Sequence, residues 1–439
     1  MHVSLDSALG RQRRLNSVGE SVLQIAPNAA AAYSLRSLTG GDPKVVRVRR
    51  GSNNVESDFT ASGVSSGALL DFVTTPQIGW NLQPTFSNDS GTGSVTSQSS
   101  TATTATVSFT GDATLLRESS KPNHVLGSSG DQVIFNISVS GLDSAMTFRL
   151  RTASSNTTVA SRSVSNGDNQ DITLNLTGSA GYLAITAVAS SGGTITFNSI
   201  KVLPKSGFVE TWYDQSGNSK DAIQTTANLQ PVIVAAGVFQ NGLKFDSDGS
   251  SSGPDFRTPI SSAQLSNDPA GNAGFALVWV GNVNQVQHAD TQNHSVLGNI
   301  KGVATFSTGT IGLTVIPKTG TTKFISETGG STTEIVEDTN ALTPGDFGVV
   351  FFSYEDAGSG VDPLLSVDGS TTTSGLSSLS SSSSNNIGIM TAITGGNAVQ
   401  YSRSTDGICK EVLLYTGDQK SKRVALETNI AAEYGITLS

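Results

Sequence analysis

The chain has 439 residues, of which 36% are hydrophobic and 14% charged, with 47 Gly and a single Cys. This length allows two or three domains, and a single cysteine excludes a fold held together by internal disulfides. No apolar run approaches the roughly 20 residues that cross a bilayer, and the first residues lack the pattern of a secretion signal. We therefore expect a protein that is made in a cytoplasm and has no membrane span.

The charges are divided unevenly along the chain. Residues 1–50 hold 8 Lys and Arg against 3 Asp and Glu, whereas the remaining residues hold 18 against 32. We interpret residues 1–25 as a basic leader on an acidic body, and Arg11, Arg13 and Arg14 as its partner-binding residues. A solvated tail is the alternative. Nucleic acid is disfavoured because the basic cluster is short and has no interleaved aromatic residues.

Local patterns predict elements near both ends of the chain. The Ala-rich residues 29–38 favour a helix that ends at Gly40. Residues 45–50 predict a strand of partly alternating polarity. Residues 418–434 predict a C-terminal helix with one apolar face, and Gly435 suits its C-terminal cap.

The rest of the chain has the texture of an all-β protein. Residues 76–205 contain short segments of alternating polarity, separated by Gly, Ser and Asn turns, which is typical of an antiparallel sandwich. After residue 206 the predicted strands become more apolar. Cys409 lies in one of them, where we expect a small buried side chain rather than a catalytic thiol.

Four short segments carry a family resemblance. Residues 32–36 (AYSLR) and 46–52 (VRVRRGS) resemble the opening of the α-L-arabinofuranosidase B catalytic domain. Residues 211–218 (TWYDQSGN) resemble a later part of the same domain, and residues 427–432 (ETNIAA) resemble its last helix. Related jelly rolls with the same Arg-rich and YDQSG segments also occur in bacteriophage structural proteins.

The resemblance implies a concanavalin-A-like jelly-roll sandwich that is discontinuous, over residues 26–75 and 206–439. Residues 76–205 interrupt it and resemble carbohydrate-binding modules of the jelly-roll type, ending in residues 194–202 (TITFNSIKV). That second likeness concerns the fold and says little about a ligand. The expected class is therefore all-β, with one β-sandwich inserted into another, plus a short N-terminal and a C-terminal helix.

The catalytic residues of the family do not carry over. A retaining glycosidase needs two carboxyl groups roughly 5–5.5 Å apart. The family's nucleophile is a Glu beside paired cysteines, but the comparable residues 280–299 contain neither Glu nor Cys. The family's acid is an Asp after a Gly-Gly pair, and here Asn397 follows Gly395 and Gly396. We therefore predict no catalytic residues and no enzyme activity.

Five residues are candidates for contact with a ligand, namely Trp80, Trp212, Tyr213, Asp214 and Asn218. Aromatic faces and short polar side chains are what a sugar-binding surface uses. The alternative for the polar residues is an Asx-type turn that holds two strands in place. For Trp80 the alternative is a place in the core.

Two charged groups have structural and functional interpretations. Arg47, Arg49 and Arg50 can pair with acidic residues of the sandwich or contact a substrate or partner. Asp246 and Asp248 supply oxygen ligands of the kind calcium binds, but the spaced acidic partner of a full motif is missing. Calcium is thus a weak candidate, and we expect no other metal or cofactor.

Together these patterns favour a bacteriophage virion protein of the tail, fibre or capsid-decoration kind. Residues 1–25 would bind other virion proteins, and the sandwiches would face outward on the virion and touch glycans of the host surface. We expect a homo-oligomer. The alternatives are a secreted lectin-like binding module and an arabinofuranosidase-type glycoside hydrolase.

Overall fold

The computed structural model describes the chain from residue 20 onward, with gaps. The described residues are 20–52, 54–75, 77–78, 87–100, 104–117, 127, 129–152, 157–178, 180, 182–246, 253–266, 274–284, 294–298, 310–316, 319, 321–328, 331–338, 342–355, 363–373, 384–394, 397–399 and 404–439.

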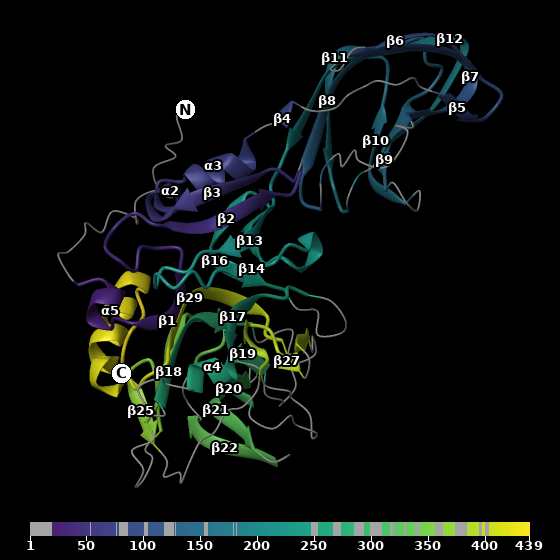
Figure 1. Cartoon of the computed structure of the whole chain (residues 1–439). Helices are drawn as coiled ribbons and strands as arrows, with labels where there is room; N and C mark the ends of the chain where they lie inside the picture. The colour runs from purple at the N-terminus through teal and green to yellow at the C-terminus, as the bar shows by residue number, and fades with distance from the viewer. Residues whose placement is uncertain are drawn as a thin grey trace.

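A 12-stranded sheet forms the centre of the larger part of the molecule (Figure 1). Its strands run in the order β25-β24-β23-β18-β29-β16-β15-β13-β2-β3, with β1 on β29 and β14 on β13. The strands are β1 (Ala29–Ser34), β2 (Lys44–Arg50), β3 (Glu56–Thr60), β13 (Gly207–Trp212), β14 (Ala222–Ile223), β15 (Val232–Ala235), β16 (Val238–Phe245), β18 (Gly274–Val283), β23 (Gly348–Glu355), β24 (Leu364–Val367), β25 (Ser370–Thr373) and β29 (Gly407–Tyr415).

A six-stranded sheet, in the order β17-β26-β19-β20-β21-β22, packs against one face of the large sheet. Its strands are β17 (Arg257–Ser261), β19 (His294–Gly298), β20 (Thr310–Ile316), β21 (Thr321–Thr328), β22 (Ser331–Asp338) and β26 (Asn386–Ile389), and a small hairpin, β27 (Ile393–Thr394) and β28 (Ala398–Val399), lies near β26. One apolar core joins side chains of both sheets, among them Trp279, Phe352, Leu313 and Ile389. The two sheets therefore form a sandwich.

The other face of the large sheet is covered by the two ends of the described chain. Helix α1 (Val22–Ile25) and helix α5 (Arg423–Tyr434) lie over β18, β23 and β29 in a second apolar cluster. Strand β18 is buried on both faces, which explains why it reads as a continuous apolar run. The remaining helical segments are α2 (Ala61–Ser65), α3 (Ala68–Thr74), α4 (Ser262–Ser266), η1 (Ala227–Leu229) and η4 (Lys420–Lys422).

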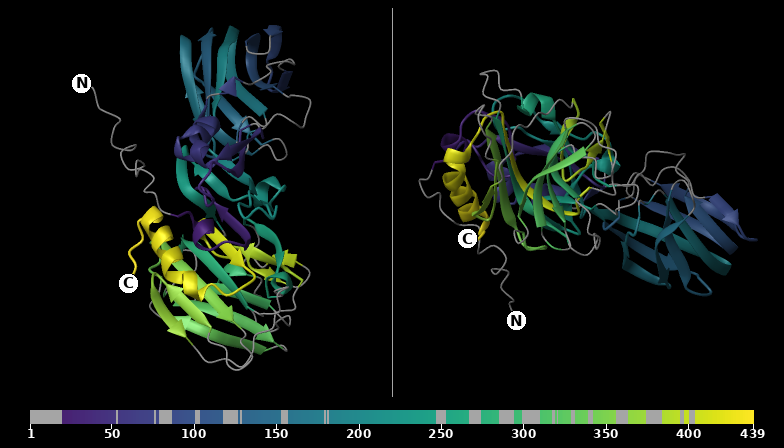
Figure 2. Two further views of the ribbon diagram at one scale, coloured as in Figure 1. Left: turned by 60° about the vertical axis from the view of Figure 1, so that its left-hand side comes forward. Right: turned by 90° about the horizontal axis from the view of Figure 1, so that it is seen from below.

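Residues 77–203 form a separate nine-stranded sheet that folds over on itself (Figures 1 and 2). Its strands are β4 (Gln77–Ile78), β5 (Ser87–Ser90), β6 (Ser94–Ser100), β7 (Ala105–Arg117), β8 (Gln132–Ser140), β9 (Met146–Arg151), β10 (Thr158–Val164), β11 (Gly167–Asn175) and β12 (Tyr182–Leu203). The long strand β12 pairs with β9 along its first part and with β8 along its second. A hydrophobic core separate from that of the larger sandwich lies between the layers of this sheet and contains Phe135, Phe148 and Phe197. We call this part the insert.

The expected all-β class is confirmed, with several antiparallel sheets and few short helices. The C-terminal helix is also confirmed, and Gly435 ends it in the left-handed conformation with φ of 68°. The predicted strand at residues 45–50 is β2. Cys409 is buried in β29. The domain boundaries at residues 76 and 205 stay a prediction.

The helix expected at residues 29–38 is wrong, because residues 29–34 form strand β1. This strand pairs with β29, and its two faces enter different cores: Ala31 faces the sandwich, and Ala32 lies beneath the terminal helices. Small side chains fit a strand that is buried on both faces. The helix preference of Ala is below about 1 kcal/mol per residue, so tertiary packing outweighs it.

The expected leader overlaps the packed body. Val22 is fully buried under α5, within the residues 1–25 assigned to the leader. Arg11, Arg13 and Arg14 lie outside the described residues. None of the helices in the described part of the chain is long and apolar enough to span a membrane.

Candidate functional site

Four of the five candidate ligand-binding residues, Trp212, Tyr213, Asp214 and Asn218, lie at the end of β13 or in the turn that follows it. Trp212, the last residue of that strand, is fully buried, and its ring centroid lies 5.7 Å from that of Tyr33. A side chain in the core has no face free for a sugar. The prediction of Trp212 as a ligand-binding residue is therefore wrong, because an irregularity in β13 between Val209 and Thr211 shifts the alternation and places Trp212 opposite Val46 in the core. Trp80 lies outside the described residues.

Asp214 uses both carboxylate oxygens within the protein. Oδ1 accepts hydrogen bonds from the backbone N–H groups of Ala32 and Ser216, both at 2.9 Å. Oδ2 accepts from the Ser216 hydroxyl at 2.8 Å and from the Lys220 backbone N–H at 3.0 Å. These contacts close a tight Asx-type turn and tie it to β1.

The next side chains continue the attachment to β1. Gln215 donates its backbone N–H to the carbonyl oxygen of Ala32 at 2.8 Å, and its side-chain Nε2 donates to the carbonyls of Ser34 and Arg36, both at 3.0 Å. Asn218 Nδ2 donates to the carbonyl of Ala29 at 2.8 Å. Because β29 occupies the opposite edge of β1, this turn acts as the missing neighbouring strand.

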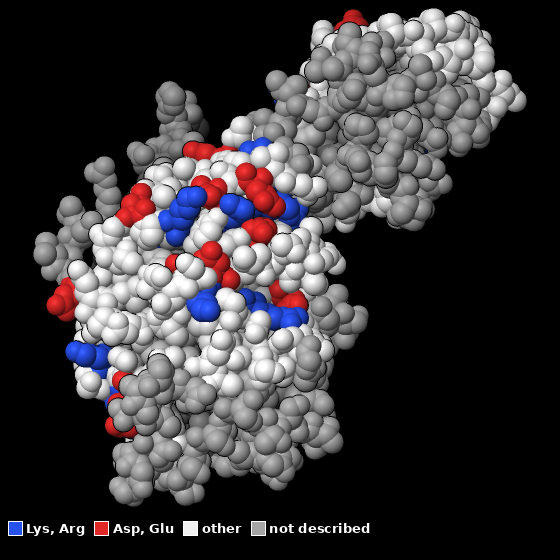
Figure 3. All heavy atoms as spheres, in the orientation of Figure 1, with Lys and Arg blue, Asp and Glu red and all other residues white. Residues whose placement is uncertain are grey.

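Tyr213 belongs to a charged cluster at the surface of the large sheet (Figure 3). Its hydroxyl donates to Asp58 Oδ1 at 2.7 Å, and Asp58 also accepts from Arg47 Nε at 2.7 Å and Lys44 Nζ at 2.8 Å. Burial and the Asp58 carboxylate raise the pKa of Tyr213 to about 12. The hydrogen bond from Arg47 is the main cause that holds the pKa of Asp58 well below its usual range.

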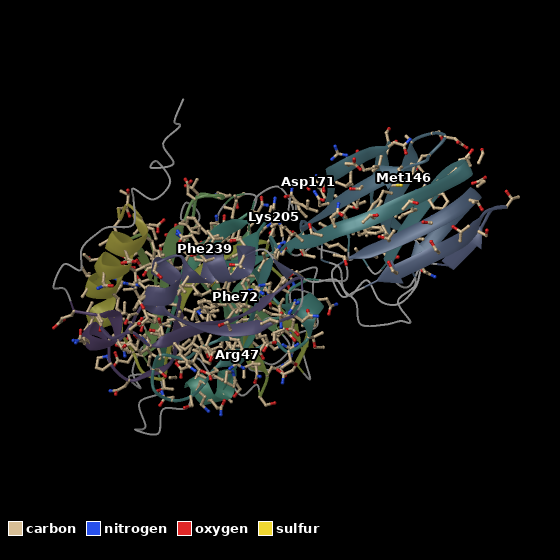
Figure 4. The ribbon with its side chains drawn as sticks, turned by 90° about the horizontal axis from the view of Figure 1, so that it is seen from above. Arg47, Phe72, Met146, Asp171, Lys205 and Phe239 are labelled. Atoms are coloured by element: carbon tan, nitrogen blue, oxygen red, sulfur yellow. The ribbon has the colours of Figure 1, made fainter. Side chains whose placement is uncertain are left out.

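The three arginines of β2 have different partners. Among the described residues, Arg47 alone of the three forms an ion pair with a carboxylate, that of Asp58. Arg49 donates to amide and backbone oxygens and lies 4.7 Å above the Phe208 ring. Arg50 donates to the backbone carbonyl of Phe72 in α3, and its guanidinium lies over the Phe72 ring. Figure 4 labels Arg47 and Phe72. The prediction of carboxylate pairing is therefore wrong for two of the three, since their neighbours offer neutral acceptors and aromatic faces.

A buried charged cluster, which the sequence did not suggest, joins β1, β29 and α5. Glu411 is fully buried, and its carboxylate accepts from Arg36 Nε at 2.8 Å and Arg36 Nη2 at 3.1 Å. Ser34 and Tyr434 also hydrogen-bond to Glu411 Oε2, at 3.1 and 2.9 Å. Arg36 Nη1 donates to Asn429 Oδ1 at 3.0 Å. We call these five residues the Glu411 clasp.

Asn397, which the sequence resemblance compared with an acid, has partners within the protein. Asn397 Oδ1 accepts the backbone N–H of Asn386 at 2.8 Å, and its own N–H donates to Asn385 Oδ1 at 3.2 Å. The Asn397 carbonyl accepts from Arg257, whose guanidinium also pairs with Asp255. The Asn397 side chain therefore holds a loop together.

Of the two residues of the weak calcium candidate, Asp246 has a partner within the protein, and Asp248 lies outside the described residues. Asp246 pairs with Lys244 at 3.3 Å. Nearby, Asp406 Oδ2 accepts from Asn284 Nδ2 at 2.8 Å. Within the described ranges, no group of three or more His, Cys, Asp and Glu is placed to hold a metal ion.

Two carboxyl groups predict how stability depends on pH. Burial, with Asp246 nearby, raises the pKa of Asp406 to about 6, and burial, with Glu427 nearby, raises the pKa of Asp368 to about 6. In an unfolded chain the pKa of Asp is about 3.9. The folded state thus binds more protons between pH 4 and 6, so the free energy of unfolding falls as pH rises through this window.

We therefore expect the free energy of unfolding to be about 1–2 kcal/mol higher at pH 4.5 than at pH 6.5. Urea denaturation at both pH values measures the difference. Replacing Asp368 and Asp406 by Asn should reduce it, whereas Asp112→Asn on the exposed part of β7 should not. A stability that rises with pH through this window in the wild type would contradict the assignment.

No family model matches the chain, and no curated protein matches it. Among solved structures, a Trypanosoma rangeli sialidase is 11% identical over 76% of this chain and 62% of its own, with a TM-score of 0.33. A GH54 α-L-arabinofuranosidase is 14% identical over 69% of this chain and 62% of its own, with a TM-score of 0.27. Domains LG4-5 of the mouse laminin α1 chain are 10% identical over 69% of this chain and 84% of theirs, with a TM-score of 0.24.

These are distant structural matches to carbohydrate-active and concanavalin-A-like β domains. The chain spans about 62% of the length of the sialidase and arabinofuranosidase chains that it matches. At such similarity they carry no argument about a site.

Proposed function

We propose that the chain is a structural protein of a bacteriophage virion, of the tail, fibre or capsid-decoration kind, whose insert projects outward to contact glycans of the host surface. The observation that carries this proposal is the junction between the insert and the larger sandwich. It is short, it is hydrogen-bonded from both sides, and it holds the insert away from the rest of the molecule (Figures 1 and 4).

The junction joins two strands with only three residues between them, since β12 ends at Leu203 and β13 begins at Gly207. The Lys205 backbone N–H donates to the buried carboxylate of Asp131 in the insert, at 2.7 Å. From the larger sandwich, the Gly51 N–H donates to the Ser206 carbonyl at 2.9 Å. A connection anchored on both sides suits a projecting module better than a flexibly tethered one.

The placement of the polar residues also supports a structural role. The side chains that the sequence suggested for a ligand form the turn that completes β1, and Asn397 secures a loop. The Glu411 clasp likewise ties together strands and a helix. In this arrangement the conspicuous polar side chains hold the sandwich together rather than face a substrate.

The start of the described chain suits an anchor on the larger sandwich. Asn429 of α5 donates its Nδ2 to the carbonyl of Glu20, the first described residue, at 2.9 Å, which fixes Glu20 beside α5. This point lies on the part of the molecule away from the insert (Figure 2). A leader bound to a particle here would leave the insert free to reach outward.

Deletion of residues 1–19 tests the anchor. We expect the shortened chain to fold, because Val22 and the contacts of Glu20 remain, but to be lost from assembled particles. A matched chain in which Arg11, Arg13 and Arg14 are replaced by Gln tests the charge alone. Undiminished incorporation of the deleted chain into particles would contradict the anchoring role.

An assay for hydrolysis separates this proposal from the glycosidase alternative. We expect no turnover of 4-nitrophenyl α-L-arabinofuranoside above the buffer rate, because Asn397 has no carboxylic proton to donate. Turnover that disappears when one carboxylate of the chain is replaced by its amide would favour the enzyme instead.

A further inference from the structure

We propose that one outer face of the insert, on strands β9, β10 and β12, binds an acidic polysaccharide through Arg149 and Arg151. We call this surface the arginine face. The inference rests on the proposed glycan-contacting role of the insert and names the chemical class of the glycan.

The two arginines point away from the core of the insert. Along β9 the side chains alternate between buried and half-buried, with Phe148 and Leu150 inward and Thr147, Arg149 and Arg151 outward. Residues two apart on one face of a strand are about 6.8 Å apart. The two arginine side chains therefore leave β9 on the same face, two residues apart.

The residues opposite Arg149 on the neighbouring strands are small and uncharged. On β10, Ser161 lies opposite Arg149 and Ser163 lies opposite Thr147. On β12, Ala184 lies opposite Arg149. Ala184 is fully buried although it is on the same, outward face of the sheet as Arg149. Arg149 Nη1 donates to Thr186 Oγ1 on β12 at 2.8 Å, so its side chain lies across the sheet.

The charges of the arginine face are not neutralised within the described residues. Arg36, Arg47, Arg257 and Arg423 each form an ion pair. Arg149 has a threonine hydroxyl as its partner instead, and the buried Arg151 Nε has no hydrogen-bond partner in the described part of the chain.

A guanidinium group binds a carboxylate or sulfate through two parallel hydrogen bonds, which are stronger than those between neutral groups. The face is therefore complementary in charge to an anionic chain. On the same face, Asp112 of β7 lies opposite Val188 of β12. The face therefore carries a negative charge on its β7 side and its two arginines on the β9 side, next to β10.

The hydroxyl groups favour a polysaccharide over a nucleic acid as the anionic chain. Ser161, Ser163 and Thr147 can donate to and accept from sugar hydroxyls beside the two guanidinium groups. Nucleic-acid surfaces use many more cations than two, because each backbone phosphate carries a charge. The geometry fits a chain with acid groups spaced among hydroxyls.

Binding of the full chain to alginate, polygalacturonate and heparin tests the inference, with neutral dextran and a single-stranded DNA oligonucleotide as competitors. We expect binding to one or more of the acidic polysaccharides that weakens as salt increases. The variant Arg149→Gln with Arg151→Gln should weaken it about tenfold or more. Arg162→Gln on the exposed edge strand β10 removes the same kind of charge from another place and should leave binding within about twofold.

Each other outcome overturns the arginine face. An equal loss in the Arg162 variant would mean that net charge alone attracts the polymer. Equal binding of dextran would mean that charge is not what the insert recognises, and tighter binding of DNA would assign the face to a nucleic acid. No binding of any acidic polysaccharide would reject the glycan class, while recovery of the chain from phage particles would still support the virion role.

Discussion

Replacing Arg36 by Met is expected to lower the free energy of unfolding by about 3–5 kcal/mol, because it leaves a buried charge without its partner. Glu411 is fully buried, and Arg36 supplies two of the hydrogen bonds to its carboxylate. The remaining donors, Ser34 and Tyr434, are neutral and cannot balance the charge.

Urea denaturation measures this loss of stability. Two further variants test whether the loss comes from the unpaired buried charge. Lys44→Met breaks a pair at an exposed lysine, 62% accessible, and should cost no more than about 1 kcal/mol. Arg36→Met combined with Glu411→Met removes both charges and should recover much of the lost stability. A loss below about 1 kcal/mol for Arg36→Met would show that the clasp contributes little.

Replacing Asp214 by Ala should cost about 3 kcal/mol, since hydrogen bonds to a charged group contribute about 1.5–3 kcal/mol each and four are lost. Part of the cost is offset because the side chain is half-buried and water can replace it. The loss should concentrate at β1, where hydrogen exchange at the Ala32 backbone N–H would become faster.

This variant also separates the two interpretations of the turn. A structural turn predicts lower stability and faster exchange at Ala32, with binding to glycans unchanged at temperatures where the variant is folded. A ligand site predicts the reverse, with binding lost and stability kept. Asp246→Ala, which removes a carboxylate from an exposed pair, is the matched control for the charge change.

Local sequence patterns predict much of this fold. Alternating polarity identifies strands of the insert such as β8 and β9, whose burial alternates residue by residue. The end of α5 follows from Gly435, which takes the left-handed conformation. The turn after β13 was also one of the two interpretations of its motif, because Asp and Asn side chains cap their own backbone.

What local patterns could not predict depends on partners distant in the sequence. Residues 29–34 become a strand because β29, almost 400 residues later, pairs with them. The clasp joins Arg36 to Glu411 across 375 positions, and neither residue lies in a pattern that marks it. The register irregularity in β13 between Val209 and Thr211 also breaks the alternation that a local pattern assumes, so Trp212 could be taken for a surface residue.

Gln215 shows how a motif can contain a signal that goes unused. It lies inside the TWYDQSGN run, and its side chain hydrogen-bonds to the backbone of Ser34, at the end of β1, and of Arg36 and Leu38, just after it. A glutamine between two turn-forming residues is a candidate for backbone contacts from its sequence position alone. Its importance appears only once β1 is known to lie beside the turn.

The most direct test of a virion role is peptide mass spectrometry on density-purified phage particles from the culture that produces the protein. We expect the chain to be recovered in stoichiometric amount with the other particle proteins, and its copy number to distinguish a capsid decoration from a tail component. Absence from particles, with the chain found free in the medium, would contradict the virion role and favour a released glycan-binding protein.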